Sequence, residues 1–484
     1  MPDAISFLLN GELRRIERPA PERTVLDHLR LVERRTGTKE GCAEGDCGAC
    51  TVVLGERSGD AVSYRAVNSC ILFTTELDGK LLLTVEGLRD ADGGLHPAQR
   101  ALVEHHGSQC GYCTPGFVMT LFALHHAPEM TDEDSIHQAL SGNLCRCTGY
   151  RPILAAARSV AGVGDDRFAR MARELLGRLD GLRRAPGMAT VIDGEYGRYD
   201  APESLAALDR LLTAHPGAHL LAGGTDLGLL VTKQHRALGH VISLNRIPEL
   251  SRIEASADAL IVGAAANYTD ILPRLENDWP SFAALIRRLG SWQIRNLGTM
   301  GGNVANASPI GDSPPALLAL GAEAIIRSAG GERVLPLERF FLAYRRTALD
   351  AGEYLRALRI PRPAAGDFFR TYKVSKRFEQ DISAVCGAFF LRFDDAGRVT
   401  LARIAYGGMA ATPKRAVGAE AALAGRRFDA AAVDAAIAAL ADDFTPIDDF
   451  RASATYRRHV AGNLLRRALM ERTAPETPTG VLAL

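Results

Sequence analysis

The spacing of the cysteines constrains this chain more than any other feature of its sequence. Eight of its nine cysteines lie before residue 150, in two arrays of four. The first array contains Cys42, Cys47, Cys50 and Cys70, and the second contains Cys110, Cys113, Cys145 and Cys147. Four thiolates are the set that one [2Fe–2S] cluster needs. The arrays therefore predict two iron–sulfur sites and point to electron transfer.

The first array has the Cys-x4-Cys-x2-Cys spacing, with a distant fourth cysteine, that is typical of plant-type ferredoxins. Glycines at 41, 45 and 48 suit a loop that wraps an anionic cluster and points its amides at sulfur. A structural zinc site or a disulfide is the alternative. Zinc sites favour paired Cys-x2-Cys segments, which the four-residue gap fits poorly.

The surrounding sequence predicts a small α+β domain like a plant-type ferredoxin. Asn10-Gly11 is a strong hairpin signal between apolar stretches at 5–9 and 12–16. A helical pattern begins at Thr24. Further strands are expected at Thr51–Leu54, Ala61–Val67 and Leu81–Val85.

The second array lies among helical patterns, which predict a small four-helix bundle. The helices are expected at Pro97–His105, Pro115–His126, Thr131–Leu140 and Pro152–Val160, with Thr131 and Asp134 as a capping box. Cys113 and Cys147 then stand just before helix N-termini, where the dipole stabilises an anionic cluster. Zinc also suits this spacing. The position directly behind a ferredoxin-like domain favours iron–sulfur.

Length and charge limit the remaining possibilities. A chain of 484 residues predicts about three or four domains. Lys plus Arg and Asp plus Glu number 57 each, so no net field recruits nucleic acid or an anionic membrane. The apolar stretch Ile5–Leu9 is too short for a signal peptide, and we find no apolar run long enough to cross a bilayer. We expect a soluble, cytoplasmic metalloprotein, because cysteine-rich cytosolic proteins bind metal more often than they form disulfides.

The middle of the chain reads as an α/β region. An amphipathic pattern over 166–182 precedes a linker at 183–190, which contains Pro186-Gly187. A helix at Ser204–Leu212 then alternates with expected strands at His219–Leu221, His240–Leu244 and Ala259–Val262.

Two glycine-rich loops stand out in this region, at Ala222–Gly228 and Leu297–Asp312. Such loops let backbone amides approach a pyrophosphate, although plain turns also use them. Neither has the Rossmann G-x-G-x-x-G pattern. Asp312 is expected either to accept from ribose hydroxyls or to cap the helix that Pro314-Pro315 begins. A dinucleotide pocket and plain turns both remain open.

From about residue 367 a smaller domain is expected. Its strands are predicted at Phe368–Tyr372, Ser383–Phe393 and Ala402–Tyr406, and its helices at Asp429–Leu440 and Ser453–Glu471. Cys386 lies in the apolar second strand and is expected to be a buried cysteine without function. The segment after Glu471 is expected to be a mobile tail.

Together these motifs resemble the xanthine oxidase family of molybdenum hydroxylases over nearly the whole chain. The resemblance implies a multidomain α+β fold. Its parts are a β-grasp ferredoxin-like domain (1–90), a four-helix [2Fe–2S] domain (91–163), a linker (164–187), an α/β FAD-binding domain of the vanillyl-alcohol-oxidase or PCMH type (188–365), a small C-terminal α+β flavoprotein domain (366–475) and a tail (476–484). The molybdopterin domain has no place in 484 residues, so a separate large subunit is expected to carry it, in a two-plus-two heterotetramer.

The resemblance also implies roles for individual residues. The second cysteine array would lie nearest molybdenum and the first nearest flavin, with Gln109 contacting the pterin and Tyr344 lying where NAD docks. The animal members have an aromatic residue over the flavin at the position of Leu289, so flavin potential and oxygen access are expected to differ here. The FAD contacts would be Ala222, Gly223, Gly224, Thr225, Asp226, Leu227, Gly228, Thr299, Gly302, Asn303, Asn306, Asp312, Leu355 and Lys373.

The implied activity is hydroxylation of hypoxanthine and xanthine to urate, with electrons passing from molybdenum on the partner through two clusters and FAD to NAD. No residue of this chain is expected to catalyse the hydroxylation. One alternative is the same arrangement serving an aldehyde or another N-heterocycle. Others are a self-sufficient iron–sulfur flavoprotein reductase and a zinc-stapled scaffold protein.

Overall fold

The computed structural model describes residues 4–90, 92–185 and 187–480. It divides into two compact units. The first contains the described residues up to Pro248 together with Gly290–Gly298, and the second contains Glu249–Leu289 and the described residues from Thr299 onward. Within the described residues, none of the helices combines the length and apolar character needed to cross a membrane.

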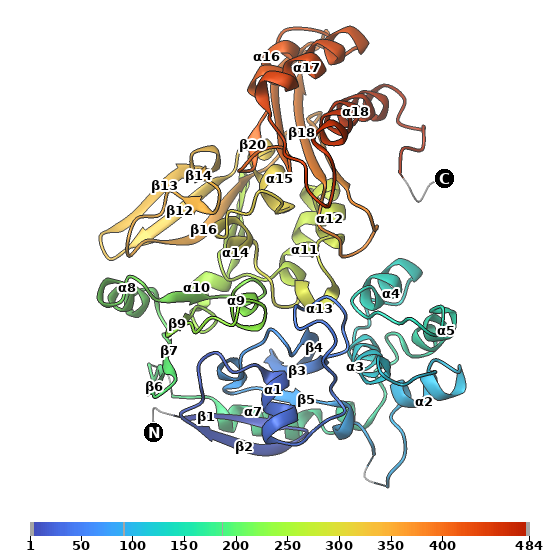
Figure 1. Cartoon of the computed structure of the whole chain (residues 1–484), viewed down its shortest axis with the longest axis vertical. Coiled ribbons are helices and arrows are strands. Elements are labelled where there is room, and N and C mark those ends of the chain that lie inside the picture. The colour runs from blue at the N-terminus through green and yellow to red at the C-terminus, as the bar shows by residue number, and fades with distance from the viewer. Residues whose placement is uncertain (1–3, 91, 186, 481–484) are drawn as a thin grey trace. The chain divides into compact units, whose positions relative to one another are not determined.

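The first unit begins with a five-stranded mixed sheet in the order β2-β1-β5-β3-β4 (Figure 1). Asn10 and Gly11 both have positive φ, which gives the predicted two-residue hairpin turn between β1 and β2. Strand β5 pairs parallel to β1 and antiparallel to β3. The elements are β1 (Ala4–Leu9), β2 (Glu12–Glu17), α1 (Val25–Asp27), a π-helical turn (His28–Val32), β3 (Thr51–Ser58), β4 (Ala61–Asn68) and β5 (Leu81–Leu83).

Four helices follow, as the sequence predicts. They are α2 (Pro97–Glu104), α3 (Thr114–His125), α4 (Glu133–Leu140) and α5 (Arg151–Val160). Helix α3 is buried from Gly116 to His125 and packs against β3 and β4, so it joins the bundle to the sheet. The predicted capping box at Thr131 is wrong. Asp132 caps α4 instead, because its carboxylate accepts from the Ser135 amide one residue further on.

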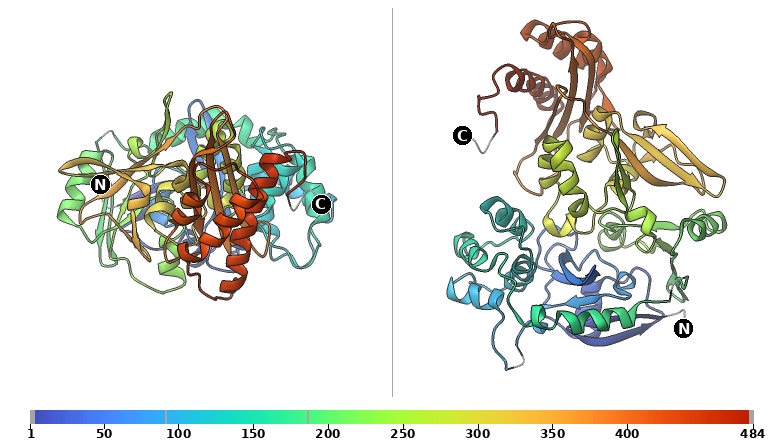
Figure 2. Two further views of the ribbon diagram at one scale, coloured as in Figure 1. Left: turned by 90° about the horizontal axis from the view of Figure 1, so that it is seen from above. Right: turned by 180° about the vertical axis from the view of Figure 1, so that it is seen from behind.

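The predicted helix over 166–182 is broken in two at Met171, giving α6 (Arg167–Arg170) and α7 (Ala172–Leu182). Asp166 caps the first of them by accepting from the Ala169 amide. Helix α7 runs across β1, β3 and β4, as Figure 2 shows in the view from behind. Pro186 of the predicted linker lies outside the described residues.

A second sheet completes the first unit, in the order β6-β7-β9-β8. Strand β9 pairs parallel with both β7 and β8. The remaining elements of this unit are β6 (Thr190–Gly194), β7 (Gly197–Ala201), α8 (Leu205–Ala214), β8 (His219–Leu221), α9 (Leu227–Thr232), β9 (His240–Ser243) and α13 (Trp292–Arg295).

The second unit contains an antiparallel sheet in the order β10-β11-β16-β12-β13 and a short β14-β15 hairpin. Its apolar core gathers around Trp279, at the junction of α11 and α12, Phe282 of α12, and Leu358 and Ile360 of the sheet. The elements are α10 (Pro248–Ser251), β10 (Ile253–Ala255), β11 (Ala259–Gly263), α11 (Tyr268–Asp278), α12 (Pro280–Arg287), α14 (Met300–Ala305), α15 (Ser313–Leu320), β12 (Glu323–Ser328), β13 (Gly331–Pro336), β14 (Phe341–Ala343), β15 (Arg346–Thr347) and β16 (Tyr354–Pro361).

The C-terminal part of the second unit is a four-stranded antiparallel sheet with three helices packed beside it (Figure 1). Cys386 lies on β18 with 1% exposure, which confirms the predicted buried strand cysteine. Of the predicted tail, residues 481–484 lie outside the described residues. The elements are β17 (Phe368–Val374), β18 (Val385–Phe393), β19 (Val399–Gly407), β20 (Lys414–Arg415), α16 (Val417–Leu423), α17 (Ala430–Asp443) and α18 (Ala454–Thr473).

Candidate functional site

The loop that carries the first cysteine array is shaped around sulfur. The Sγ atom of Cys42 lies 3.4 Å from each of the amide nitrogens of Glu44, Asp46 and Cys47. Hydrogen bonds from the Cys47 and Cys70 thiols and from loop amides hold the pKa of Cys42 well below its ordinary value. Three amides of this loop thus point at one sulfur, an arrangement that suits a cluster-bound thiolate.

Glycine is required at several positions in this loop. A Cβ atom on Gly41 would lie 2.7 Å from the Sγ atom of Cys47. Gly45 and Gly48 adopt positive φ, at 78° and 69°. Because these backbone conformations turn successive amides toward one centre, the glycines fit a loop that encloses an anionic group.

The four thiols of the first array lie within reach of one another. The Cys42 thiol interacts with those of Cys47 and Cys70, and the Cys70 thiol also interacts with that of Cys50. Cys50 and Cys70 are each only 2% exposed. The residues therefore fit a single four-thiolate cluster site between the loop and the start of β3.

The second array forms two thiol pairs. The Cys113 thiol interacts with that of Cys145, and the Cys147 thiol interacts with that of Cys110. Burial, aided by the neighbouring Cys145, raises the pKa of Cys113 to about 12. Two pairs are the arrangement that suits two irons with two cysteine ligands each, so this array also fits a [2Fe–2S] cluster.

Local contacts hold the second array in place. Cys113 directly precedes α3, as predicted, although its side chain makes no capping hydrogen bond. Cys147 is separated from α5 by three residues that include Tyr150. The Tyr150 hydroxyl accepts from the Cys145 amide at 3.0 Å, and Thr148 Oγ1 lies 3.2 Å from Cys145 Sγ. Cys110 and Cys147 are exposed, so this site lies at the surface of its unit.

The two cysteine loops contact each other directly. The amide of Leu144, next to Cys145, donates to the carbonyl of Cys47 at 3.0 Å. The hydroxyl of Tyr112, between Cys110 and Cys113, donates to the carbonyl of Glu40. Cys47 of the first array is therefore linked to Cys145 of the second through a single hydrogen bond to Leu144.

Asn143 holds this junction together, and the sequence carries no sign of this role beyond the position of Asn143 two residues before Cys145. Its side-chain amide donates to the Gly48 carbonyl at 3.1 Å. Its carbonyl oxygen accepts from Thr120 Oγ1 at 2.7 Å and from Gln293 Nε2 at 2.8 Å. Asn143 is 2% exposed, so losing these partners would leave buried polar atoms unpaired.

Helix α3 packs closely against the Gly48 carbonyl at this junction, and we therefore expect different effects from substituting two glycines in helices. A Cβ atom on Gly116 of α3 would lie 2.2 Å from the Gly48 carbonyl oxygen, whereas one on Gly177 of α7 would meet nothing within 4 Å. Gly177→Ala is expected to stabilise the protein by about 0.5–1 kcal/mol because alanine favours helix. Gly116→Ala is expected to destabilise it by about 1–3 kcal/mol, as overpacking does. Chemical unfolding of both variants checks this, and equal effects would contradict the contact.

The glycine-rich loop Ala222–Gly228 packs beside the first array. A Cβ atom on Gly228 would lie 2.9 Å from the carbonyl oxygen of Ile71, the residue after Cys70. A Cβ atom on Gly223 would lie 2.2 Å from the Leu297 carbonyl oxygen. Lys233, just after α9, donates to the Cys42 carbonyl at 2.6 Å. Close packing thus accounts for both glycines and brings this predicted FAD loop against the first cysteine site.

The second glycine-rich loop forms a helix start within the second unit. Thr299 Oγ1 accepts from the Gly302 amide at 2.9 Å and caps α14. The Asn303 side-chain carbonyl accepts from Ser313 Oγ at 2.6 Å, and Asn306 ends the helix. A Cβ atom on Gly301 would lie 2.5 Å from Ala264, so this glycine is needed for packing.

Asp312 does not cap α15, because its side chain makes no capping hydrogen bond. One carboxylate oxygen instead accepts from Lys373 Nζ at 2.6 Å, and the other accepts from Ser383 Oγ at 2.5 Å. Lys373 Nζ also donates to the Arg288 carbonyl at 3.0 Å. All three side chains are buried, so the predicted FAD residues Asp312 and Lys373 form a buried ion pair.

The remaining predicted residues have different surroundings. Leu355 is 4% exposed on β16, where it is paired with Ile326. Leu289 is partly buried against the core of the second unit. Tyr344 lies at the turn of the β14–β15 hairpin with 62% exposure, and Gln109 is exposed just ahead of Cys110.

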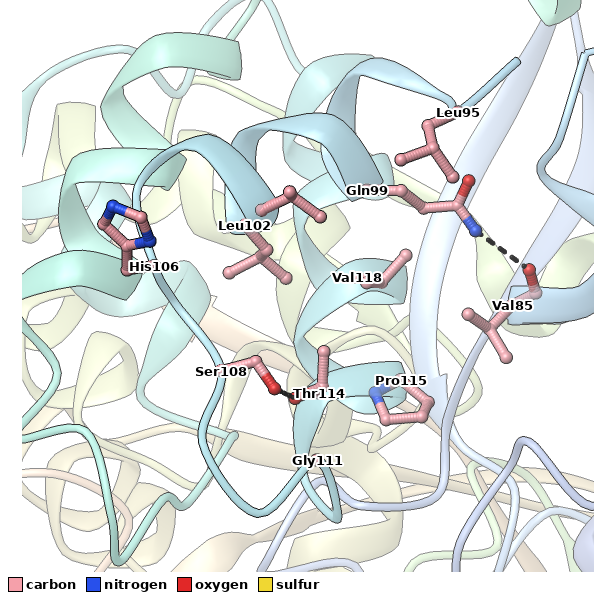
Figure 3. Close-up of a pocket in the computed structure, with 11 residues that line it drawn as sticks. Val85, Leu95, Gln99, Leu102, His106, Ser108, Gly111, Thr114, Pro115 and Val118 are labelled. Atoms are coloured by element: carbon pink, nitrogen blue, oxygen red, sulfur yellow. Dashed lines mark hydrogen bonds between the residues drawn. The ribbon is translucent and has the colours of Figure 1, made fainter.

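An apolar pocket of about 470 Å³ lies between α2 and the start of α3, beside the loop that carries Cys110 (Figure 3). The Ser108 and Thr114 hydroxyls lie 2.7 Å apart at its edge, and the Gln99 side chain donates to the Val85 carbonyl. Gly111, between two cysteines of the second array, borders it. The second cysteine site and this pocket therefore share one surface of the first unit.

Four family models match consecutive parts of the chain. A 2Fe-2S iron-sulfur cluster binding domain matches residues 7–74, and a [2Fe-2S] binding domain matches residues 84–158. The FAD binding domain in molybdopterin dehydrogenase matches residues 194–363, and the CO dehydrogenase flavoprotein C-terminal domain matches residues 370–472. The chain thus contains two [2Fe–2S] domains, a PCMH-type FAD-binding domain and a C-terminal flavoprotein domain.

Several proteins of known function or structure are similar to this chain. Xanthine dehydrogenase of Emericella nidulans is 32% identical over 95% of this chain, and aldehyde oxidase 2 of Cavia porcellus is 32% identical over 90% of it. The chain spans only 38% and 37% of their lengths. A solved structure of carbon monoxide dehydrogenase from Hydrogenophaga pseudoflava has a TM-score of 0.54 and 33% identity, covering 56% of this chain and 95% of that one. The chain therefore belongs to the molybdenum hydroxylase family.

Proposed function

We propose that the chain is the electron-transfer subunit of a xanthine dehydrogenase. When bound, two [2Fe–2S] clusters and FAD would carry electrons to NAD from molybdenum on a partner subunit as hypoxanthine and xanthine are hydroxylated to urate. The observation that carries this proposal is the order of contacts in the first unit. Leu144 joins the second cysteine array to the first, and Ile71 joins the first array to the glycine-rich loop.

The cysteines and the glycine-rich loops supply the cofactor ligands in this proposal. Each array holds one cluster, and the amides around Cys42 stabilise the negative charge on its sulfur. FAD would be held by Ala222–Gly228 and by Thr299, Gly302, Asn303, Asn306, Asp312, Leu355 and Lys373, as the family resemblance implies. Within this set, the buried Lys373 neutralises Asp312 and fixes the orientation of its carboxylate.

A large molybdopterin-binding subunit is proposed to cover the second array. Cys110 and Cys147 are exposed, and Tyr112, Leu144 and Tyr150 beside them are 49%, 38% and 38% exposed. Large apolar side chains grouped at a surface favour a protein interface. The exposed Gln109 would contact the pterin there, and two copies of each subunit would form a heterotetramer.

Tyr344 is proposed to contact the nicotinamide of NAD, because its exposed ring offers a stacking surface. We place the protein in the cytoplasm, since nine free thiols and metal-type cysteine spacing suit a reducing compartment. Nothing in these residues selects the oxidised substrate. The identity to an aldehyde oxidase keeps aldehydes as the second candidate substrate class.

The proposal is tested by purifying the chain with its copurifying subunit under anaerobic conditions and following NAD reduction. Hypoxanthine and xanthine are expected to support turnover, and benzaldehyde and quinoline are the competing substrates. Faster NAD reduction with benzaldehyde or quinoline would show that the substrate is an aldehyde or another N-heterocycle instead. Full NAD-linked activity of the chain without a molybdenum-containing partner would overturn it in favour of a self-sufficient reductase.

A further inference from the structure

A cluster of buried histidines surrounds Asp166, outside both cysteine arrays. Asp166 Oδ2 lies 2.6 Å from His96 Nε2 and 2.8 Å from His126 Nε2. Desolvation would raise the pKa of Asp166, but the hydrogen bonds from His126 and His96 outweigh it and hold the pKa well below its ordinary value. A carboxylate with 3% exposure is therefore kept ionised among imidazole rings.

His125 brings an unused nitrogen to the same cluster. Its Nδ1 atom lies 3.0 Å from the Val160 carbonyl oxygen, which can only accept, so the proton is on Nδ1 and Nε2 carries a lone pair. Nε2 is buried without a hydrogen-bond partner among the described residues, and the residue is 1% exposed. Burial lowers the pKa of His125. An orphaned buried acceptor costs about 1–3 kcal/mol, which a bound ligand would remove.

The ligand atoms of this cluster lie close enough together to share one ion. One atom from each of His96, His125 and Asp166 lies within 4.8 Å of the others. The buried hydroxyl of Tyr64 is a second polar group that has no hydrogen-bond partner among the described residues. The Tyr64 ring lies 4.6 Å from that of His126, so this hydroxyl belongs to the same region. Buried polar atoms without partners next to a carboxylate are surroundings that a bound ion, with or without a water molecule, would complete.

We propose that His125 and Asp166, together with His96 and His126, bind one divalent transition-metal cation such as Zn²⁺. Imidazole nitrogen and carboxylate oxygen are ordinary zinc ligands. The Nδ1–H group of His125 donates to a backbone carbonyl, which is the outer contact that typically orients a metal-binding histidine. This site contains no cysteine, and it goes beyond the electron-transfer function proposed above.

The histidines differ in how readily they could coordinate the cation. His96 Nδ1 accepts from the Ala98 amide at 3.1 Å, so His96 Nε2 carries a proton in the hydrogen bond to Asp166. Coordination through that nitrogen would require loss of the proton and of the helix cap. His125 needs no such change. His125 and Asp166 are therefore the two residues on which binding must depend.

A cavity lies against one side of the cluster. His125 and His126 line a cavity of about 460 Å³ together with the loop at Gly162–Asp165. This volume far exceeds what one ion with a bound water needs. The cluster therefore lies against a cavity that is large enough to bring a hydrated cation next to two of its histidines.

The test is metal analysis and zinc K-edge absorption spectroscopy on the anaerobically purified protein with its clusters and FAD. After chelator treatment and addition of one equivalent of Zn²⁺, the protein is expected to retain about one zinc with only nitrogen and oxygen neighbours, at about 2.0–2.1 Å. Sulfur neighbours at about 2.3 Å would show zinc in the cysteine sites and would overturn the proposal. Failure to retain zinc would overturn it too, and an unchanged iron content would show that the proposed clusters are unaffected.

A variant pair makes the assignment specific. His125→Ala is expected to weaken zinc binding at least about 100-fold, since loss of an outer contact alone costs 10- to 100-fold. His137→Ala is the control, because His137 is an exposed histidine of the same bundle that pairs with Glu133. Equal zinc affinity in His125→Ala would refute the site. His125→Gln introduces a side-chain amide that can still donate to the Val160 carbonyl, so it should retain the fold. It should also lose zinc, because it has no imidazole nitrogen.

Discussion

Cys113→Ser is expected to abolish substrate-dependent NAD reduction while the reduction of dyes by NADH continues. Cys113 is paired with Cys145 in the second array, and serine oxygen is a poor substitute for a thiolate that binds iron. Loss of a ligand should lower turnover at least about 100-fold, because loss of an outer contact already costs up to about that amount. The dye reaction requires only the flavin, which the proposal places with the first array. Steady-state assays of the intact complex with both acceptors measure the two activities separately.

Cys386→Ser provides the matched control for this substitution. Cys386 is buried on β18 and belongs to neither array, so its replacement should leave the iron content unchanged. If Cys113→Ser lowered both activities equally, or if it kept substrate-dependent NAD reduction, the second array would not be the entry point for electrons.

Lys373→Met is expected to have the largest effect on stability. Lys373 and Asp312 form a buried ion pair, with Ser383 on the other carboxylate oxygen. Removing the cation leaves an uncompensated buried carboxylate, which costs about 3–5 kcal/mol. The free energy of unfolding can be followed by Trp279, which is buried in the second unit, in a Trp292→Phe background. FAD occupancy should fall, with iron content unchanged.

The double variant Asp312→Asn/Lys373→Met distinguishes the cost of an unpaired buried charge from the cost of altered side-chain packing. Because it removes both charges, it should recover most of the lost stability. FAD occupancy should stay low if the Asp312 carboxylate binds FAD. Arg359→Met is the surface control, since it breaks solvent-accessible pairs with Asp258 and Glu323 and should change stability by only about 1 kcal/mol. A Lys373→Met variant as stable as this control would contradict the role given to the buried pair.

The sequence predicted those features that are encoded over short stretches. The cysteine spacing, the hairpin at Asn10-Gly11 and the helices of the bundle each depend on neighbouring residues. The cap of α4 was misplaced by one position because Thr131 and Asp132 are both good capping residues. Local preference therefore identifies the elements and the ligand types better than the position of a boundary.

The contacts that organise the sites could not be predicted, because they join residues far apart in the chain. Asn143 meets Gly48 and Gln293, and Lys373 meets Asp312 across 61 positions. Cysteine spacing likewise gave no sign that Leu144 would bond to Cys47. Such pairings follow from how the sheets and helices pack, and a single sequence read by itself carries no record of that packing.

The most direct test of the account is the iron, sulfide, zinc and FAD content of the anaerobically purified chain, combined with electron paramagnetic resonance after reduction. The two cysteine arrays predict about four irons and four sulfides per chain and two distinguishable [2Fe–2S] signals, with one FAD. About two irons with a single signal, or zinc bound by sulfur in either array, would contradict the central claim that each array holds a diiron cluster.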